Sequence, residues 1–349
     1  MRIPVTLLTG FLGSGKTTLL QRLLHDPALS GAAVLINEVG EVGLDHHMVQ
    51  EVAEEIVLLE SGCLCCTVRG DLSRSLRDLF MRRLRREIAA LDRVIIETTG
   101  LADPAPVIHT LMNDFFLAPR FVLDGVVTTV NVGHVREQIE RQPEALKQIA
   151  VADRIVLTKT DIADAATTQS AEAIVSALNP TARLVRAVDA NDASLVAGMG
   201  AYDADARPAD VARWLNEVAA AEQERLVARA GVFGAFGYDA PEVLHDRRIA
   251  TYALRFDKPF AWGDFSSAVD LLQLTVGDQL LRIKGLVAIE GETAPRLFHA
   301  VQHERYPTES LTAWPDDDRG TRLVFIVRDL PCAVIEHAFR ALAAADSPH

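Results

Sequence analysis

The amino-acid sequence predicts an α/β protein in which a domain with a mostly parallel sheet is followed by a smaller α+β C-terminal domain. In the first half of the chain, short apolar runs alternate with segments whose apolar residues have helical spacing. Runs such as Val94-Ile95-Ile96 are apolar on both faces, as expected where helices cover both sides of a parallel sheet. From residue 249 the expected strands become longer and are interspersed with helices. The length of 349 residues exceeds the roughly 100–200 residues of one domain, which also favours two domains.

The elements of the first domain, which we place at residues 1–190, follow from the apolar pattern. Strands are expected at 5–9, 33–37, 56–59, 94–97, 125–130, 154–158 and 183–187. A helix is expected over 17–24. A longer helix with an arginine-rich outer face is indicated by the apolar series Leu72, Leu76, Leu79, Phe80, Leu84 and Ile88.

The second half of the chain has a different pattern. Residues 191–245 are expected to form a linker with a helix over 210–230, because they are rich in Ala, Asp and Glu and end near a glycine cluster. The C-terminal domain is placed at 246–345, with Cys332 in its core. It is expected to contain strands at 249–256, 280–289 and 322–327 and helices at 265–272 and 333–343.

The composition disfavours several classes of protein. Hydrophobic residues make up 49% of the chain and charged residues 24%, which is typical of a globular protein. The formal net charge of −13 disfavours general binding to nucleic acid or to an anionic membrane. No apolar run approaches the roughly 20 residues of a membrane span, and no signal peptide is recognised. We therefore expect a cytoplasmic protein without a nucleic-acid or membrane partner.

A phosphate-binding loop spans Gly10 to Thr17. Its sequence, Gly-Phe-Leu-Gly-Ser-Gly-Lys-Thr, satisfies the pattern G-x-x-x-x-G-K-[ST] between a strand and a helix. Backbone N–H groups of such a loop surround phosphate oxygens, and the helix N-terminus adds a favourable dipole. Lys16 is expected to reach the β- and γ-phosphates, and the Thr17 hydroxyl to ligate Mg²⁺. These features predict a P-loop NTPase domain, with nucleotide contacts from Gly10, Gly13, Ser14, Gly15, Lys16, Thr17 and Thr18.

The segment from Val94 to Gly100 supplies two further candidates. Glu97 ends an apolar strand, where P-loop enzymes place the acidic residue that faces Mg²⁺. Gly100 stands three residues later, where its N–H could sense the γ-phosphate. We assign the catalytic machinery to Lys16, Thr17 and Glu97. The alternative for Glu97 is a surface residue at the end of a buried strand.

A base-recognition element is predicted at residues 158–161. Thr-Lys-Thr-Asp follows a strand and is similar to the guanine-reading pattern N-K-x-D. The Asp161 carboxylate can accept hydrogen bonds from guanine N1 and its exocyclic amine, a pairing that adenine cannot offer. The Lys159 stem can lie over the base. Thr158 replaces the usual Asn, and an ordinary loop after a strand is the alternative.

Three of the four cysteines, Cys63, Cys65 and Cys66, lie within four residues between a strand and the arginine-rich helix. Thiolates bind Zn²⁺, Cu(I) and other thiophilic ions, and a helix N-terminus favours the thiolate form. Three ligands are one short of a closed tetrahedral site, which suits an ion that must be passed on. Buried small hydrophobes or a redox-active dithiol are the alternatives. The fourth ligand stays open among water, a partner's residue, Glu38, Glu41, His46 and His47.

Taken together, these residues resemble the CobW-type family of P-loop GTPases. The resemblance rests on residues 10–17, on Glu-Ser-Gly-Cys-Leu-Cys-Cys at 60–66 and on Glu-Thr-Thr-Gly at 97–100. It extends to 158–161 and to C-terminal stretches at 281–286 and 300–315. It implies a GTPase that binds a transition metal, zinc or next cobalt, at the cysteines and delivers it to a client protein or cofactor pathway. It further implies that residues 37–45 form a nucleotide-sensitive switch.

The function predicted from the sequence is that of a GTP-hydrolysing metallochaperone with GTP or GDP, Mg²⁺ and Zn²⁺ (or Co²⁺) as its ligands. Its partner would be a client metalloprotein or metal-cofactor enzyme, and homodimerisation is left open. A P-loop kinase acting on a small molecule is one alternative, although a kinase has no use for a cysteine triplet. A redox-sensing nucleotide-binding adaptor is the other.

Overall fold

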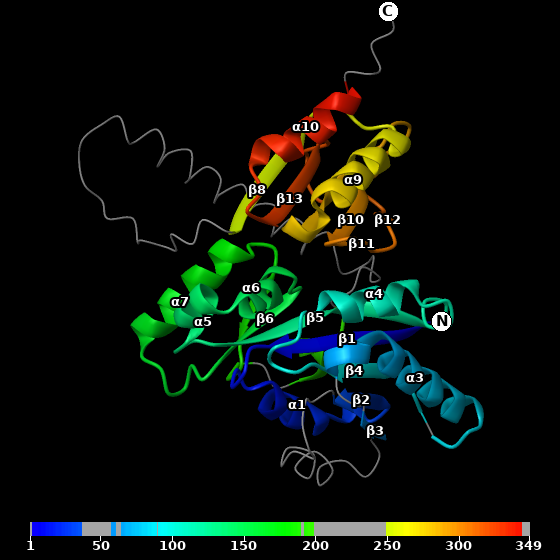
Figure 1. Ribbon diagram of the computed structural model, residues 1–349, viewed down its shortest axis with the longest axis vertical. Coiled ribbons are helices and arrows are strands. Elements are labelled where there is room, and N and C mark those ends of the chain that lie inside the picture. The colour runs from blue at the N-terminus through cyan, green and yellow to red at the C-terminus, as the bar shows by residue number, and fades with distance from the viewer. Residues whose placement is uncertain are drawn as a thin grey trace, which may run out of the picture. The chain divides into compact units, whose positions relative to one another are not determined.

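The computed structural model describes residues 2–36, 57–60, 64–88, 90–189, 192–198 and 249–343 (Figure 1). The chain divides into two compact units. The N-terminal unit comprises Met1–Ala173 and Ala182–Tyr202, and the C-terminal unit comprises Ile174–Thr181 and Asp203–His349. The predicted fold class is confirmed, because the first unit holds a parallel sheet with helices and the second a smaller antiparallel sheet with helices.

The N-terminal unit is built on a sheet of seven described strands, and each neighbouring pair of these strands is parallel. Its order is β3-β2-β4-β1-β5-β6-β7. The strands are β1 (Ile3–Gly10), β2 (Ala32–Ile36), β3 (Val57–Glu60), β4 (Arg93–Glu97), β5 (Phe121–Asn131), β6 (Arg154–Thr158) and β7 (Arg183–Arg186). Because parallel strands end at the same edge, Gly10, Glu97 and Thr158 are brought to one side of the sheet.

Helices cover both faces of this sheet, as the two-sided apolar strands predict. Figure 1 shows α1 and α4 on opposite sides of β1. Leu20 and Leu23 of α1 join a buried cluster with Leu8 and Ile95 of the sheet. The helices of this region are α1 (Lys16–Leu24), α3 (Leu64–Leu84), α4 (Ala105–Asn113), α5 (Val135–Arg141), α6 (Pro143–Ala150) and α7 (Ala165–Leu178), with short 3₁₀ turns at Pro27–Leu29 and Ala193–Leu195.

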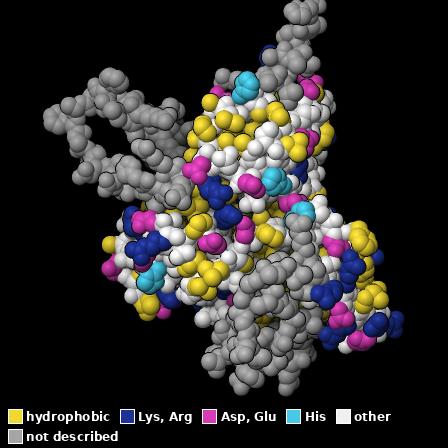
Figure 2. Space-filling view, in the orientation of Figure 1, with side chains coloured by type: hydrophobic (Ala, Val, Ile, Leu, Met, Phe, Trp, Pro, Cys, Tyr) yellow, Lys and Arg dark blue, Asp and Glu magenta, His cyan; other side chains and the backbone are white. Residues whose placement is uncertain are grey.

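The arginine-rich helix differs from its prediction in two ways. It begins at Leu64, eight residues before the first apolar position of the predicted series, and ends at Leu84. Leu72, Leu76 and Leu79 are buried as expected, whereas Leu84 is 61% exposed. Figure 2 shows basic and hydrophobic side chains mixed at this end of α3. Leu84 follows the apolar spacing, but it is the last residue of the helix.

Hydrogen bonds to the Asp114 carboxylate connect α3 to the segment after α4. Ser73 Oγ donates to Asp114 Oδ2 at 2.5 Å, and Arg77 Nη2 donates to the same carboxylate at 3.2 Å. Asp114 Oδ1 also accepts from the N–H groups of Phe116 and Leu117. These contacts hold the helix that begins with Leu64, Cys65 and Cys66 against its neighbour.

The C-terminal unit contains an antiparallel sheet with strand order β11-β10-β9-β13-β8, and β12 pairs with β10. Phe265, Phe298, Phe325 and Phe339 form its core between the sheet and two helices. The predicted strands and both helices are confirmed. β11 and β12 were not predicted because each has only two residues, and β10 was missed although it has six. The elements are β8 (Ile249–Phe256), α9 (Trp262–Val276), a 3₁₀ turn (Gly277–Gln279), β9 (Leu280–Val287), β10 (Arg296–Val301), β11 (Glu304–Arg305), β12 (Glu309–Ser310), β13 (Thr321–Arg328) and α10 (Cys332–Ala343).

Cys332 was expected in this core, and that expectation is wrong. It opens α10 and is only half-buried, and its Sγ donates to Glu336 Oε1 at 3.7 Å.

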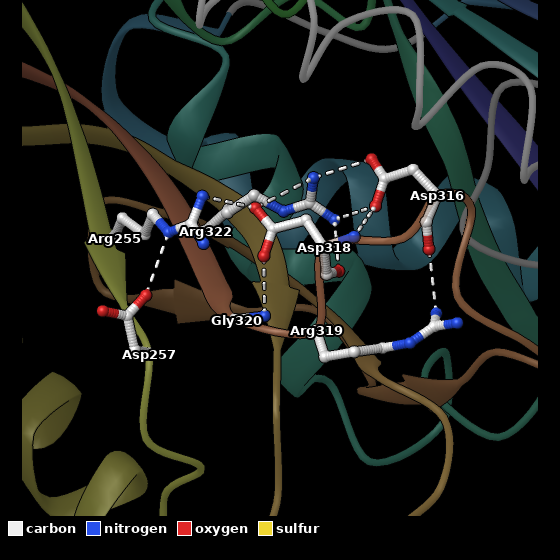
Figure 3. Close-up of polar contacts among 7 residues, drawn as sticks. All are labelled: Arg255, Asp257, Asp316, Asp318, Arg319, Gly320 and Arg322. Carbon is white, nitrogen blue, oxygen red and sulfur yellow. Dashed lines mark hydrogen bonds and ion pairs between the residues drawn. The ribbon is translucent and has the colours of Figure 1, made fainter.

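Two arginines lie directly opposite one another on β8 and β13, namely Arg255 and Arg322. Like charges in this position destabilise a sheet unless they are neutralised. Asp316 accepts two hydrogen bonds from Arg322, at 2.7 and 2.9 Å, and Asp318 forms an ion pair with Arg255 at 2.8 Å (Figure 3). The loop before β13 therefore supplies the carboxylates that this arginine pair requires.

We expect Asp316→Asn to destabilise the C-terminal unit by about 1–2 kcal/mol near neutral pH. The Arg322 hydrogen bonds hold the pKa of Asp316 below its ordinary value of 3.8, although burial acts in the opposite direction. A lowered folded-state pKa stabilises the folded state above the unfolded-state pKa, and this contribution is lost as the pH falls through the lower folded-state pKa. Thermal melting of the full chain at pH 7 and below pH 4 measures the difference between wild type and variant, which should shrink in acid.

The control is Asp317→Asn, because Asp317 is exposed, and the Arg322 guanidinium pairs with its neighbours Asp316 and Asp318 instead. An equal loss of stability in both variants at pH 7 would refute a specific role for Asp316.

Several predictions lie outside the described residues. These are the linker helix over 210–230, the switch at 37–45, the end of the second strand at Asn37, and the candidate fourth ligands Glu38, Glu41, His46 and His47. Within the described part of the chain, no helix is long and apolar enough to cross a membrane.

Candidate functional site

The loop from Gly10 to Thr17 joins the end of β1 to the start of α1. Gly10, Gly13 and Gly15 have φ values of 142°, 68° and 89°, a region that residues with a side chain rarely adopt. A Cβ at Gly10 would lie 2.3 Å from Thr129 Oγ1, whereas one at Gly13 would meet nothing within 4 Å. The loop is therefore packed against β5 at its first glycine and open at its middle, which fits a cradle that a phosphate group enters.

Buried hydroxyl groups of neighbouring strands form hydrogen bonds with this loop. Ser14 Oγ lies 2.6 Å from Thr129 Oγ1. Thr158 Oγ1 lies within hydrogen-bond distance of Ser14 O, at 2.7 Å, and of Val130 O, at 3.1 Å. Thr158 thus connects the end of β6 to the phosphate loop, so the residue that departs from the N-K-x-D pattern still provides a supporting contact.

Lys16 is buried, with 9% of its surface exposed. Its Nζ donates to Gly10 O at 2.9 Å and to Phe11 O at 3.3 Å, so the side chain folds back over the loop. An ammonium held by carbonyl oxygens can exchange them for phosphate oxygens, which carry more negative charge. This position fits the predicted phosphate contact.

Thr17 and Glu97 lie together at the start of α1 and the end of β4. Thr17 Oγ1 donates to Glu97 Oε1 at 2.8 Å, and Glu97 is 4% exposed. A hydroxyl and a carboxylate are hard oxygen donors of the kind that Mg²⁺ selects. The pair fits a magnesium ion beside the phosphate cradle.

The loop after β4 packs directly on the phosphate loop. A Cβ at Gly100 would lie 2.6 Å from the Leu12 amide nitrogen and 2.8 Å from Leu12 Cα. Thr98 Oγ1 donates to Thr9 Oγ1 at 2.9 Å, and Thr98 N donates to Leu8 O. Only glycine allows this approach, which places the backbone of residue 100 next to the phosphate-binding backbone.

Lys159 and Asp161 follow β6 on an exposed turn. Lys159 has a φ of 59°, and Ile162 N donates to Lys159 O at 3.4 Å. Both residues lie close in sequence to Thr158, which contacts the phosphate loop. Their exposed position leaves them accessible to a base.

The cysteine motif lies at the start of α3. Cys63 is outside the described residues, and Cys65 and Cys66 belong to the first turn of the helix. Among the side chains that the structure describes, no group of three or more His, Cys, Asp and Glu could hold a metal ion.

Sequence reasoning missed Gln148, which is fully buried in the last turn of α6. Its Nε2 donates to Gly100 O at 3.1 Å and to Ala102 O at 3.0 Å. The neighbouring Lys147 forms an ion pair with Asp103 at 2.6 Å. One signal was available in the sequence, because Gln148 lies three residues after the apolar Ala145, which is helical spacing.

A parallel sheet with a glycine loop, an inward lysine and a hydroxyl–carboxylate pair defines a P-loop nucleotide-binding protein. The chain belongs to the CobW/HypB/UreG family: the model of that family's nucleotide-binding domain matches residues 4–186. The model of the cobalamin synthesis protein cobW C-terminal domain matches residues 249–343.

The chain is similar over nearly its whole length to proteins of known name. It is 33% identical to the zinc chaperone YjiA of Escherichia coli, covering 97% of this chain and 98% of that protein. It is 28% identical to the zinc chaperone CobW of Pseudomonas aeruginosa, covering 98% and 92%. The crystal structure of Zn(II)-bound YjiA GTPase from E. coli superposes with a TM-score of 0.71 at 27% identity, covering 98% of this chain and 99% of that one.

Proposed function

We propose that this protein is a GTP-hydrolysing metallochaperone that binds zinc, with cobalt as the next candidate, and delivers it to a client protein or cofactor pathway. The observation that carries the proposal is the phosphate loop with its Thr17–Glu97 pair at 2.8 Å in a chain that also holds the cysteine triplet. Full-length similarity to two proteins named zinc chaperones, one of them also named a GTPase, supports it.

Nucleotide binding uses the phosphate loop. Backbone N–H groups from Gly10 to Thr18 surround the phosphates, and Lys16 leaves the carbonyls of Gly10 and Phe11 for the β- and γ-phosphates. Bound Mg²⁺ would supply charge neutralisation on the phosphate oxygens. Thr17 and Glu97 would hold that ion, and the Gly100 N–H would contact the γ-phosphate. Asp161 would read guanine, with the Lys159 stem over the base.

The cargo site consists of Cys63, Cys65 and Cys66 at the start of α3. Three thiolates bind zinc and leave one position through which the ion can be exchanged. Nucleotide state must change the affinity for zinc if hydrolysis is to drive release, because only a difference in affinity shifts an equilibrium.

We assign separate roles to the domains proposed from the sequence, at residues 1–190, 191–245 and 246–345. The family matches at 4–186 and 249–343 support them. The client metalloprotein would dock on the C-terminal domain. The net charge of −13 favours a protein partner over nucleic acid or a membrane, and a cytoplasmic location is consistent with reduced thiols. A homodimer is compatible with the proposal.

The test measures zinc affinity by competition with a chromophoric chelator in the presence of a non-hydrolysable GTP analogue and of GDP. We expect at least about tenfold tighter binding with the GTP analogue, within the usual range of coupling between sites. Cys65→Ser should weaken zinc binding by about tenfold or more and remove most of this difference.

The matched control is Cys332→Ser, since Cys332 lies in the other unit and outside the motif. Equal zinc affinity in both nucleotide states would refute nucleotide-driven release. Unchanged zinc binding in Cys65→Ser would instead favour the redox-sensing alternative.

A further inference from the structure

The side chain of Gln148 connects α6 to the loop that follows β4. Its Nε2 donates to Gly100 O at 3.1 Å and to Ala102 O at 3.0 Å, so one amide group binds the carbonyls on both sides of Leu101. Carbonyl oxygens only accept, so the NH₂ group must be the end of the amide that faces the loop. Both of its hydrogens are used, which fixes the orientation of the side chain.

Two observations indicate that this contact does more than fill the core. Gln148 is fully buried, yet its Oε1 has no hydrogen-bond partner among the described residues. A buried acceptor without a partner is unfavourable, so its presence requires a specific reason. Gln148 also lines a small cleft together with Phe11 of the phosphate loop and Thr129 beneath it.

Neighbouring contacts act on the same loop. Lys147 Nζ lies 2.6 Å from Asp103 Oδ2, so two successive residues of α6 hold residues 100–103. The α6 helix is itself anchored on the sheet, because Thr128 Oγ1 donates to Gln148 O at 2.8 Å. On its other side the loop meets Leu12, whose amide nitrogen would lie 2.6 Å from a Cβ at Gly100. Residues 100–103 are thus held between the phosphate loop and α6.

We infer that Gln148 is a positioning residue for nucleotide hydrolysis: its two hydrogen bonds set where the Gly100 N–H stands relative to the γ-phosphate, and Lys147 assists. The inference rests on the proposed GTPase function. GDP has no γ-phosphate, so a displaced loop affects binding of GTP and its hydrolysis but leaves binding of GDP nearly unchanged. This asymmetry separates positioning from a general contribution to folding.

The experiment compares wild type, Gln148→Leu and Gln148→Glu in the full chain. Leucine keeps the approximate volume and removes the donor, while the glutamate carboxylate would face two carbonyl oxygens. We expect both variants to lower kcat for GTP by about tenfold or more, since small displacements near a reacting group have large effects. We also expect the affinity ratio of a non-hydrolysable GTP analogue to GDP, measured with fluorescent nucleotides, to fall by a similar factor, while GDP affinity changes less than about twofold.

Gln138→Leu is the matched control. Gln138 lines the same cleft from α5, whereas the side-chain hydrogen bonds to Gly100 O and Ala102 O come from Gln148. It should keep the wild-type kcat and affinity ratio. If Gln148→Leu matches Gln138→Leu in both quantities, or loses affinity for both nucleotides equally at unchanged kcat, the inference is overturned.

Lys147→Met covers the case in which the buried variants do not fold, because the Lys147 side chain is 22% exposed and its loss leaves α6 packed. An affinity ratio lowered by about threefold supports the inference, and an unchanged ratio overturns it. Wild-type protein that hydrolyses no GTP would refute the proposed function itself, whereas normal hydrolysis by wild type and by Gln148→Leu refutes only the role of Gln148.

Discussion

Replacing Lys16 with alanine should lower kcat for GTP hydrolysis by about 10³-fold, the scale of losing one group that stabilises charge in a transition state. The Lys16 ammonium is buried beside the phosphate loop and donates to Gly10 O and Phe11 O, so it needs only a short movement to reach phosphate oxygens. Steady-state phosphate release with GTP, with ATP as a competing substrate, measures the effect.

Lys258→Ala is the control, because Lys258 is an exposed lysine of the C-terminal unit. It should keep the wild-type rate. A Lys16→Ala protein that retains more than half of the wild-type kcat would show that the nucleotide binds elsewhere. Preference for ATP over GTP in the wild type would favour the kinase alternative.

Gly100→Ala should lower kcat for GTP hydrolysis and remove the preference for nucleotides that carry a γ-phosphate. The added Cβ would lie 2.6 Å from the Leu12 amide nitrogen and 2.8 Å from Leu12 Cα, so one of the two backbones must move. Displacement of either loop by about 1 Å is enough to lower kcat by roughly 10²-fold. Affinity for the GTP analogue should fall more than affinity for GDP. Turnover and fluorescent-nucleotide titration together measure both effects.

The matched control is Gly133→Ala in the loop after β5, where the new Cβ would meet only Asn131 Oδ1 at 3.5 Å. This variant should behave as wild type. Wild-type turnover by Gly100→Ala would mean that the loop does not need to lie against Leu12 during hydrolysis.

The parallel strands could be predicted closely because burial on both faces leaves continuous apolar runs. β6 is found at the predicted residues, Arg154–Thr158. β5 was predicted too short, since it begins at Phe121 and not at residue 125. Asp124 interrupts the apolar run, and the register with β1 shifts at this point, where Val5 pairs with Leu123 and Thr6 with Gly125. The buried Asp124 carboxylate is bound by Arg93, a partner that local pattern cannot reveal.

For the candidate site, the sequence predicted residues whose role depends on local backbone, such as the glycines of the phosphate loop. It also predicted Glu97, because the end of a parallel strand has a known relation to that loop. It did not predict that Thr158 would hold Ser14, or that Gln148 would hold Gly100 and Ala102, since these contacts join residues 144, 48 and 46 positions apart. The cysteine triplet and the guanine-reading residues remain predictions.

The sequence by itself determined the α/β class, the phosphate loop and the family, because each depends on short-range spacing: alternation of apolar runs, glycines at fixed positions, three thiols within four residues. Only the tertiary structure decided how the loop after β4 is held, since that required β1, β4 and α6 to meet at one edge of the sheet. The physical reason is that hydrogen bonds to Gly100 and Ala102 act over a few ångströms in space, whatever their separation along the chain. Burial of a side chain likewise depends on which elements pack around it. Leu84 is therefore exposed although it has the helical spacing of a core residue.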